Sequence, residues 1–215
     1  IVLNVYNERL LRLLAETQIP KVFLDTSSLV SPYELNGDLL LMESRNSVRN
    51  ITAHLLEKGR TLPGFMGDIG YAQSNRERYE GFCQALMDAG KTPNPSLCLT
   101  TPLGIDSYRE EIDSFLSSLS RMPDAFVCAS DYVACILMQL LEKRGLRVPE
   151  DVAVSGFDNN IEDLLAENLT TVQVFNEELG SRLALQILYR IKYPHTPHEV
   201  TYLESKVLYR ASTGD

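Results

Sequence analysis

A strand–helix alternation, repeated along the chain, most constrains what this sequence can fold into. Short apolar runs of strand type alternate with stretches in which apolar residues recur at helical spacing. The runs lie at 1–4, 21–25, 39–43, 61–67, 97–99, 125–130, 152–155 and 170–174, with two closing runs at 200–203 and 207–209. Strands separated by helices of about a dozen residues indicate right-handed βαβ units. The pattern therefore predicts an α/β fold with parallel sheets flanked by helices.

Cap and turn residues refine the expected elements. Asn7 is a good helix cap, and Leu10, Leu13 and Leu14 then share one face of the helix that follows. Pro63 lies inside the run at 61–67 and lacks the backbone N–H of a normal strand residue. We therefore expect this strand to lie at a sheet edge or to carry a bulge.

The charge balance of the chain excludes some partners. Its 215 residues include 29 Asp and Glu against 20 Lys and Arg, which gives a formal net charge of −9. A phosphate backbone repels such a chain unless its cations gather on one face, so we expect no direct contact between these residues and nucleic acid. No run approaches the roughly 20 apolar residues of a membrane helix, so we expect no membrane partner.

The cysteines indicate a reducing compartment. Cys83, Cys98, Cys128 and Cys135 show no CxxC spacing, and each lies among apolar neighbours. Such residues are typical of buried thiols and not of a disulfide framework. The first residues lack the basic start and long apolar stretch of a signal peptide. Together these features predict a cytoplasmic protein.

Polar residues follow several of the expected strands. In open parallel α/β sheets, ligands bind beyond the carboxyl ends of the strands. This rule selects Asn4, Asp25, Gly67-Asp68, Ser130-Asp131 and Gly156-Phe157-Asp158. Each has a structural explanation on its own, since Asp131 can cap a helix and Asp158 can belong to a turn. One such residue at each strand end is better explained by a ligand cleft.

The sequence lacks the common catalytic and cofactor-binding motifs. It contains no GxGxxG, no Walker-type GK[ST] and no GxSxG. His195 and His198 flank Pro197 in an expected loop without a third metal ligand, and His54 lies mid-helix among apolar positions. We therefore expect no cofactor, no metal site, no catalytic residue and no enzymatic activity.

Several segments carry a family resemblance. Residues 125–134 (AFVCASDYVA) and 141–158 (LEKRGLRVPEDVAVSGFD) resemble the effector-binding core of LacI/GalR-type transcriptional regulators. Residues 78–86 match the Arg-x-x-Gly-Phe helix of that family, and residues 19–25 match its Ile-Pro-x-Val-x-x-Asp strand. The likeness continues through 169–172, 178–180 and 208–212, so it covers essentially the whole chain.

This resemblance implies a two-lobed fold like that of periplasmic sugar-binding proteins, with three crossover strands between the lobes. The N-terminal lobe is expected to comprise residues 1–43 with 175–204, and the C-terminal lobe residues 44–174 with 205–215. Residues 1–4 correspond to a strand well inside the first lobe of the family. We therefore expect the first lobe to be incomplete here and the family's helix-turn-helix headpiece to be missing from this chain.

The resemblance also implies a ligand site between the lobes. Carried over by position, Asn4 and Asp25 face the cleft from the first lobe, while Arg78 and Asp158 face it from the second. Ser130 stands where many members have Asn, which gives a shorter side chain at that position. Tyr71 is expected to stack on the ligand, and Ser74 completes the expected ligand-binding set, which contains no catalytic or metal-binding residue.

The implied function is the ligand-sensing and dimerising part of a transcriptional regulator. A sugar or related polar metabolite is the expected effector, a homodimer the expected assembly, and DNA a partner only through the headpiece. One alternative is a solute-binding protein of a sugar transport system with the same fold. Another is a sugar-modifying enzyme, which would need an acid/base pair in the cleft.

Overall fold

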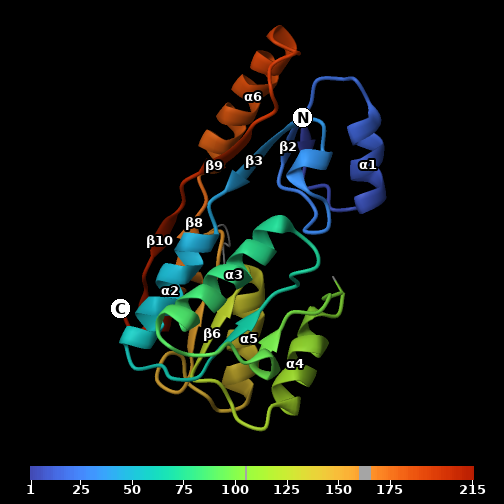
Figure 1. The fold of residues 1–215 in the computed structure, drawn as a ribbon. Coiled ribbons are helices and arrows are strands. Elements are labelled where there is room, and N and C mark those ends of the chain that lie inside the picture. Colours follow the sequence, from blue (N-terminus) through green and yellow to red (C-terminus); the bar gives the residue numbers. More distant parts are fainter. Residues whose placement is uncertain (105, 160–165) are drawn as a thin grey trace.

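The computed structural model describes residues 1–104, 106–159 and 166–215, in which the strands form two parallel sheets and one antiparallel pair (Figure 1). The first sheet has the order β1-β2-β3-β9 and consists of β1 (Val2–Leu3), β2 (Val22–Leu24), β3 (Asp38–Met42) and β9 (Val200–Leu203). The second has the order β5-β4-β6-β7 and consists of β5 (Cys98–Leu99), β4 (Pro63–Met66), β6 (Ala125–Cys128) and β7 (Ala153–Ser155). The antiparallel pair joins β8 (Thr171–Gln173) to β10 (Lys206–Leu208). The predicted α/β fold with parallel sheets is confirmed.

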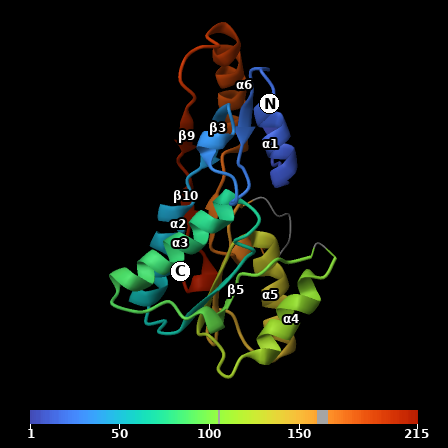
Figure 2. The same cartoon turned by 45° about the vertical axis from the view of Figure 1, so that its right-hand side comes forward.

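Helices cover both faces of the second sheet (Figures 1 and 2). One face packs against α2 (Arg45–Glu57) and α3 (Gln73–Asp88), the other against α4 (Tyr108–Ser118) and α5 (Asp131–Lys143). Successive residues of a strand point to opposite faces, so Phe65 of β4 lies in the α2–α3 core and Met66 in the α4–α5 core. A strand buried on both faces explains the continuous apolar run at 125–130.

The first sheet is covered in the same way by the two remaining α-helices. Leu39 and Leu41 of β3 pack toward α1 (Glu8–Glu16), and Leu40 packs toward α6 (Asn176–Lys192). Short 3₁₀ turns lie at Pro32–Glu34, Pro95–Leu97, Ala166–Asn168 and Ala211–Thr213. We call the part of the molecule around the first sheet the first lobe and the part around the second sheet the second lobe.

The described chain passes between the lobes after β3, after β8 and after β9 (Figure 1). The passage after β3 leads into α2, the passage after β8 leads into α6, and the last joins β9 to β10. These connections lie close together, since the Ser205 hydroxyl donates to the Glu43 carbonyl oxygen and β10 pairs with β8.

The expectation that the strand with Pro63 lies at a sheet edge or carries a bulge is wrong, because β4 lies between β5 and β6 and pairs with β6 without interruption. Pro63 is the first residue of β4 and is aligned with Ala125 of β6. Strand β5 pairs with β4 only at Phe65 and Met66, so pairing on that side begins after the proline. A first strand position tolerates the missing donor, which is how an internal strand accommodates this residue.

The helix start at Asn7 is confirmed, whereas the expected apolar face of α1 is wrong. The Asn7 side chain accepts a hydrogen bond of 2.9 Å from the Leu10 backbone N–H. Leu11 is the buried residue of α1 and belongs to the same core cluster as Phe23. Of the three predicted residues, Leu14 packs against this cluster, while Leu10 and Leu13 are exposed. The face of α1 that meets the sheet therefore lies around Leu11.

Gly81 determines how closely α2 and α3 approach each other. A Cβ atom at Gly81 would lie 2.2 Å from the backbone carbonyl oxygen of Arg45, at the start of α2. We expect Gly81→Ala to lower the free energy of unfolding by about 1–3 kcal/mol, because the helices must move apart. Urea denaturation measures this change.

The matched control for Gly81→Ala is Gly180→Ala in α6. No atom lies within 4 Å of a Cβ at Gly180, so the methyl group meets open space. Alanine is the better helix former, and we expect this variant to gain about 0.5–1 kcal/mol. Equal changes in the two variants would contradict the packing role of Gly81.

No helix within the described residues has the length and apolar character needed to cross a membrane.

Candidate functional site: a cavity between the lobes

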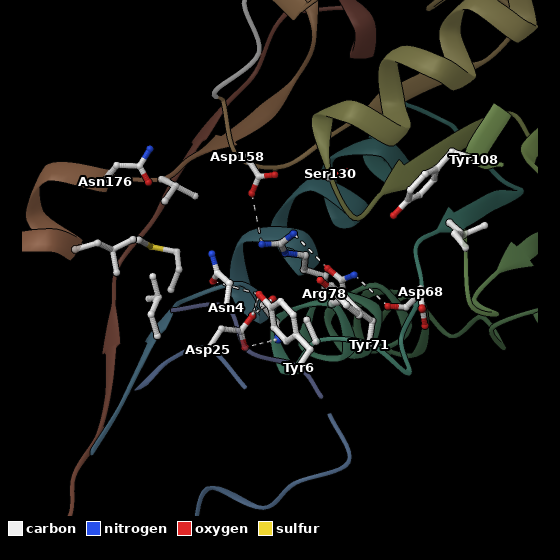
Figure 3. A pocket seen from close by; sticks show the side chains of 18 residues that line it. Asn4, Tyr6, Asp25, Asp68, Tyr71, Arg78, Tyr108, Ser130, Asp158 and Asn176 are labelled. Atoms are coloured by element: carbon white, nitrogen blue, oxygen red, sulfur yellow. Dashed lines mark hydrogen bonds and ion pairs between the residues drawn. The ribbon is translucent and has the colours of Figure 1, made fainter. Parts of the chain in front are cut away.

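A cavity of about 470 Å³ lies between the two lobes (Figure 3). Every residue of the expected ligand-binding set lines it, namely Asn4, Asp25, Tyr71, Ser74, Arg78, Ser130 and Asp158. The other lining residues are Tyr6, Leu24, Met42, Asp68, Ala72, Asn75, Leu103, Tyr108, Val174, Asn176 and Leu179. The structure thus brings the whole expected set to one place, and direct ligand contact by each residue stays a prediction.

Polar side chains reach this cavity from the carboxyl ends of the parallel strands. They are Asn4 after β1, Asp25 after β2, Asp68 after β4, Ser130 after β6 and Asp158 after β7. Asn4, Asp25 and Asp158 have positive φ angles of 50°, 57° and 116°. Asn and Asp enter this region more readily than other non-glycine residues, so the chain can turn sharply where each strand stops.

Asp25 of the first lobe hydrogen-bonds to the second lobe. Its Oδ2 accepts hydrogen bonds from the Ser74 hydroxyl at 2.6 Å and the Tyr6 hydroxyl at 3.3 Å. Its Oδ1 faces the Ser74 backbone N–H at 3.4 Å. Beside this contact, the Gln73 N–H donates to the Thr26 carbonyl oxygen at 2.8 Å. The Asp25 carboxylate therefore connects the end of β2 to the start of α3.

An aromatic pair extends the same contact. The rings of Tyr6 and Tyr71 lie with their centroids 4.3 Å apart at an interplanar angle of 45°. Burial raises the pKa of Tyr6, and the charge of Asp25 raises it further, so its hydroxyl stays protonated and donates. Tyr71 remains half exposed and presents its ring to the cavity.

Arg78 is held rigidly at the base of the cavity. Its guanidinium lies 3.6 Å above the Phe157 ring, and its Nη1 donates to the Ala129 carbonyl oxygen and to Asn75. Its Nη2 lies 3.6 Å from an Asp158 oxygen. Burial raises the pKa of Asp158, and the positive charge of Arg78 opposes that rise. The pair places the Nη2 donors beside a carboxylate, an arrangement suited to hydroxyl groups.

Ser130 and Asp131 have different tasks at the start of α5. The Ser130 hydroxyl accepts a hydrogen bond of 3.3 Å from the Val133 N–H, so Ser130 caps the helix. The Asp131 carboxylate is buried and accepts from the Thr171 hydroxyl at 2.6 Å and the Asn159 N–H at 2.7 Å. Burial raises the pKa of Asp131 to about 6. Asp131 thus ties β6 to β8, while Ser130 remains at the cavity wall.

Sequence reasoning missed several residues of the cavity. The strand-end rule selects Asp68, but the expected ligand-binding set does not contain it. Tyr6, Asn75, Tyr108 and Asn176 carry no strand-end signal, because they lie in a turn or near the start of a helix. Within the described residues, no group of three or more His, Cys, Asp and Glu side chains could hold a metal ion.

Comparison with known proteins places these features in a family. The family model described as a periplasmic binding protein-like domain matches residues 52–213. The HTH-type transcriptional repressor PurR of Aliivibrio salmonicida is 29% identical over 209 residues, which are 96% of this chain and 61% of the relative. The chain therefore spans about three fifths of the length of that relative.

Solved structures agree in fold. A transcriptional regulator CelR–cellobiose complex has a TM-score of 0.84 at 25% identity, covering 98% of this chain and 64% of the other. A putative regulator of the LacI family from Sanguibacter keddieii has a TM-score of 0.77 at 27% identity, covering 91% and 72%. These proteins are named as transcriptional regulators and not as transport proteins or enzymes. This chain belongs to the periplasmic binding protein-like domain family and is a LacI/GalR-type effector-binding domain.

Proposed function

We propose that the chain is the ligand-sensing and dimerising part of a LacI-type regulator and binds a small sugar-like effector in the interlobe cavity. One observation carries the proposal: side chains of both lobes converge on a single polar cavity. Asn4 and Asp25 come from the first lobe, and Arg78, Ser130 and Asp158 from the second. A ligand that contacts both sets at once favours one relative position of the lobes.

The lobe boundaries of this proposal follow the crossings of the chain. The first lobe comprises residues 1–43 with 175–204, and the second comprises 44–174 with 205–215. Each boundary falls between an element of one lobe and an element of the other. Rotation about these connections changes the cleft and leaves both cores intact, which is how hinged ligand-binding domains close.

Each polar group of the cavity has a role in this proposal. Arg78 and Asp158 hold adjacent hydroxyls of the effector, and the Ser130 hydroxyl donates its O–H to the effector while it accepts from the Val133 N–H. Asn4 adds an amide from the first lobe, and Tyr71 offers an aromatic face on which sugar C–H groups pack.

Control of transcription is proposed through the rest of the protein. The net charge of −9 argues against DNA contact by these residues. Operator binding is assigned to a helix-turn-helix segment, since the PurR relative is named as an HTH-type repressor. Two copies of this domain form the dimer that places two such segments on an operator, and the protein acts in the cytoplasm. A coupling of a few kcal/mol between effector and DNA gives useful control.

Thermal denaturation with a panel of sugars and nucleobases tests the proposal on the full-length protein. An effector stabilises the folded domain by mass action, so it raises the melting temperature in a concentration-dependent way. That compound should then change the affinity of the full-length protein for its operator. A compound that binds tightly but leaves operator affinity unaltered would contradict the regulatory role. Catalytic turnover of the compound would contradict the regulatory role and the effector-binding role.

The contact between Asp25 and Ser74 provides a second test, on lobe closure. Ser74→Ala removes a hydrogen bond to a carboxylate that joins the lobes, a contact of about 1.5–3 kcal/mol. We expect effector affinity to fall roughly tenfold, and small-angle scattering to show a larger radius of gyration before effector is added. Ser118→Ala is the control, because the Ser118 hydroxyl bonds only within α4. An unchanged radius with unchanged affinity in Ser74→Ala would refute the closure role.

A further inference from the structure

Negatively charged side chains outnumber positively charged ones in the described lining of the cavity. Among the described lining residues, Asp25, Asp68 and Asp158 carry carboxylates, and Arg78 carries the single positive charge. No lysine or histidine lies in the described lining. A ligand that enters this space therefore meets an excess of negative charge in a partly desolvated site, where charge interactions are stronger than in water.

Two of the three carboxylates already interact with side chains of the protein. Asp25 accepts from Ser74 and Tyr6 as described, and its Oδ1 also accepts the Thr26 N–H at 2.8 Å. Asp158 faces Nη2 of Arg78, while Nη1 of the same guanidinium donates to a backbone carbonyl and to an amide oxygen. The positive charge of Arg78 is thus directed at Asp158, and it is not available to neutralise a second group.

Asp68 has neither a counter-charge nor a hydrogen bond from a side chain among the described residues. Its Oδ1 accepts the Gly70 N–H at 2.8 Å, and its Oδ2 has no partner among the described residues. The side chain is half buried and lines the cavity after the end of β4. This charge therefore faces the ligand space with only one backbone donor to stabilise it.

Two aromatic rings lie around Asp68. In Figure 3, Tyr71 and Tyr108 lie on the same side of the cavity as Asp68, and the hydroxyl of Tyr108, at the start of α4, points into the cavity. The pKa of Tyr71 is raised by burial and by the charges of Asp25 and Asp68, and that of Tyr108 by burial, Tyr71 and Asp68. A carboxylate flanked by tyrosine rings is a favourable environment for an organic cation, since aromatic faces also attract positive charge.

We propose that the effector carries an ammonium group that binds Asp68 between Tyr71 and Tyr108, so that the effector is an amine-bearing polyol such as an amino sugar. This inference rests on the proposed effector-binding function. The remaining hydroxyls of such a ligand meet Arg78 and Asp158, as in the proposed function. Sugar phosphates and sugar acids are rejected, because they bring further negative charge to a cavity that already has an excess.

Isothermal titration of the full-length protein with matched sugars tests the inference. The probes are glucose, glucosamine, glucose 6-phosphate and glucuronate, with the same four forms of galactose, slightly below neutral pH so that the amines are protonated. We expect an amino sugar to bind at least about tenfold more tightly than its hydroxyl counterpart, and the phosphate and the acid to bind more weakly than either.

Asp68→Asn isolates the charge in this experiment. The amide oxygen still accepts the Gly70 N–H, so the turn is preserved while the negative charge is removed. We expect the preference for the amine to fall to within about twofold in Asp68→Asn and to persist in the control Asp106→Asn. Asp106 is exposed and lies outside the cavity lining.

The outcomes separate this inference from the proposed function. Equal affinity for the amine and hydroxyl forms, or an amine preference that survives in Asp68→Asn, overturns the ammonium site and leaves the sugar site in place. Tight binding of a phosphate or acid form overturns the charge discrimination. Failure of every probe to bind contradicts the proposed sugar-binding function, and this inference with it.

Discussion

Arg78→Ala is expected to lower effector affinity by at least about a hundredfold, the largest effect of any single substitution in the cavity. The guanidinium is 8% exposed and lies against Phe157, Ala129 and Asp158. Truncation removes its donors to the ligand and also leaves the half-buried Asp158 without its counter-charge. Removing one partner of a buried charge pair costs about 2–5 kcal/mol in binding, of which 1.4 kcal/mol corresponds to a factor of ten.

Arg78→Lys distinguishes the geometry of the guanidinium from its charge. A single ammonium group cannot reach the Ala129 carbonyl oxygen and Asp158 while also covering the Phe157 ring, as the planar guanidinium does. We therefore expect Arg78→Lys to recover only part of the lost affinity. Calorimetric titration with an effector found in the ligand panel measures both variants.

Arg147→Ala is the matched control for the Arg78 variants. The Arg147 side chain is 70% exposed and pairs with Asp151 four residues away on the surface. Its removal should leave effector affinity unchanged. Urea denaturation of each variant checks that binding is compared between folded proteins. Binding by folded Arg78→Ala within about threefold of the unsubstituted protein would show that Arg78 has a structural role only.

The strand-end rule explains why the cavity could be predicted from the sequence. Asn4, Asp25, Ser130 and Asp158 follow different strands and are far apart in the chain. Parallel strands place their carboxyl ends at the same edge of a sheet, so a local signal of an apolar run followed by a polar residue acquires a spatial meaning. The family resemblance then placed Arg78, which lies on a helix and follows no strand.

Residues positioned by packing between distant segments could not be predicted in this way. Tyr108 and Asn176 begin helices, and nothing in the adjacent sequence shows that these helix starts face the cleft. The buried face of α1 is a similar case. Periodicity allows a stripe through Leu10 or one through Leu11, and the choice depends on contact with Phe23 in another element.

The start of α5 shows the same limit in its hydrogen bonds. Ser130 and Asp131 are both good cap residues, so local preference does not separate them. The structure assigns the cap to Ser130 because the Asp131 carboxylate is engaged by Thr171 and by the Asn159 N–H. These partners are 40 and 28 residues away in the chain, and a sequence pattern does not reveal them.

Substitution within the Asp38–Arg190 pair is expected to have the largest effect on stability. They form an ion pair in the first lobe and are 1% and 2% exposed. The Asp38 carboxylate accepts from the Arg190 guanidinium, from the Gln186 side chain at 2.9 Å and from the Glu199 N–H at 2.9 Å. Arg190 also donates to the Pro197 carbonyl oxygen at 2.9 Å. The network joins β3, α6 and the loop that precedes β9.

We expect Arg190→Ala to lower the free energy of unfolding by about 3–5 kcal/mol, because it leaves a buried carboxylate without its counter-charge. Urea denaturation at neutral pH measures this loss. Arg147→Ala again serves as the control, since an exposed pair contributes about 0–1 kcal/mol. The double variant of Asp38 and Arg190 to alanine should lose less than the sum of the single losses, because the second change removes the unpaired group.

The pH dependence of stability gives an independent measure of the same pair. Burial alone would raise the pKa of Asp38, but the hydrogen bonds from Arg190, Gln186 and Glu199 outweigh it and hold the pKa below its ordinary value of 3.8. Because this pKa is lowered in the folded state, the Asp38 carboxylate contributes its full stabilisation at pH values above its ordinary pKa. The stabilisation is lost as the pH falls below that value. Arg190→Ala should therefore lose less stability on acidification than the unsubstituted protein. Equal losses on acidification, together with a loss of unfolding free energy no larger than that of Arg147→Ala, would contradict the role of the pair.

Neither Asp38 nor Arg190 lines the cavity, so the effector affinity of folded Arg190→Ala should be unchanged. This result would separate the stability of the first lobe from ligand sensing.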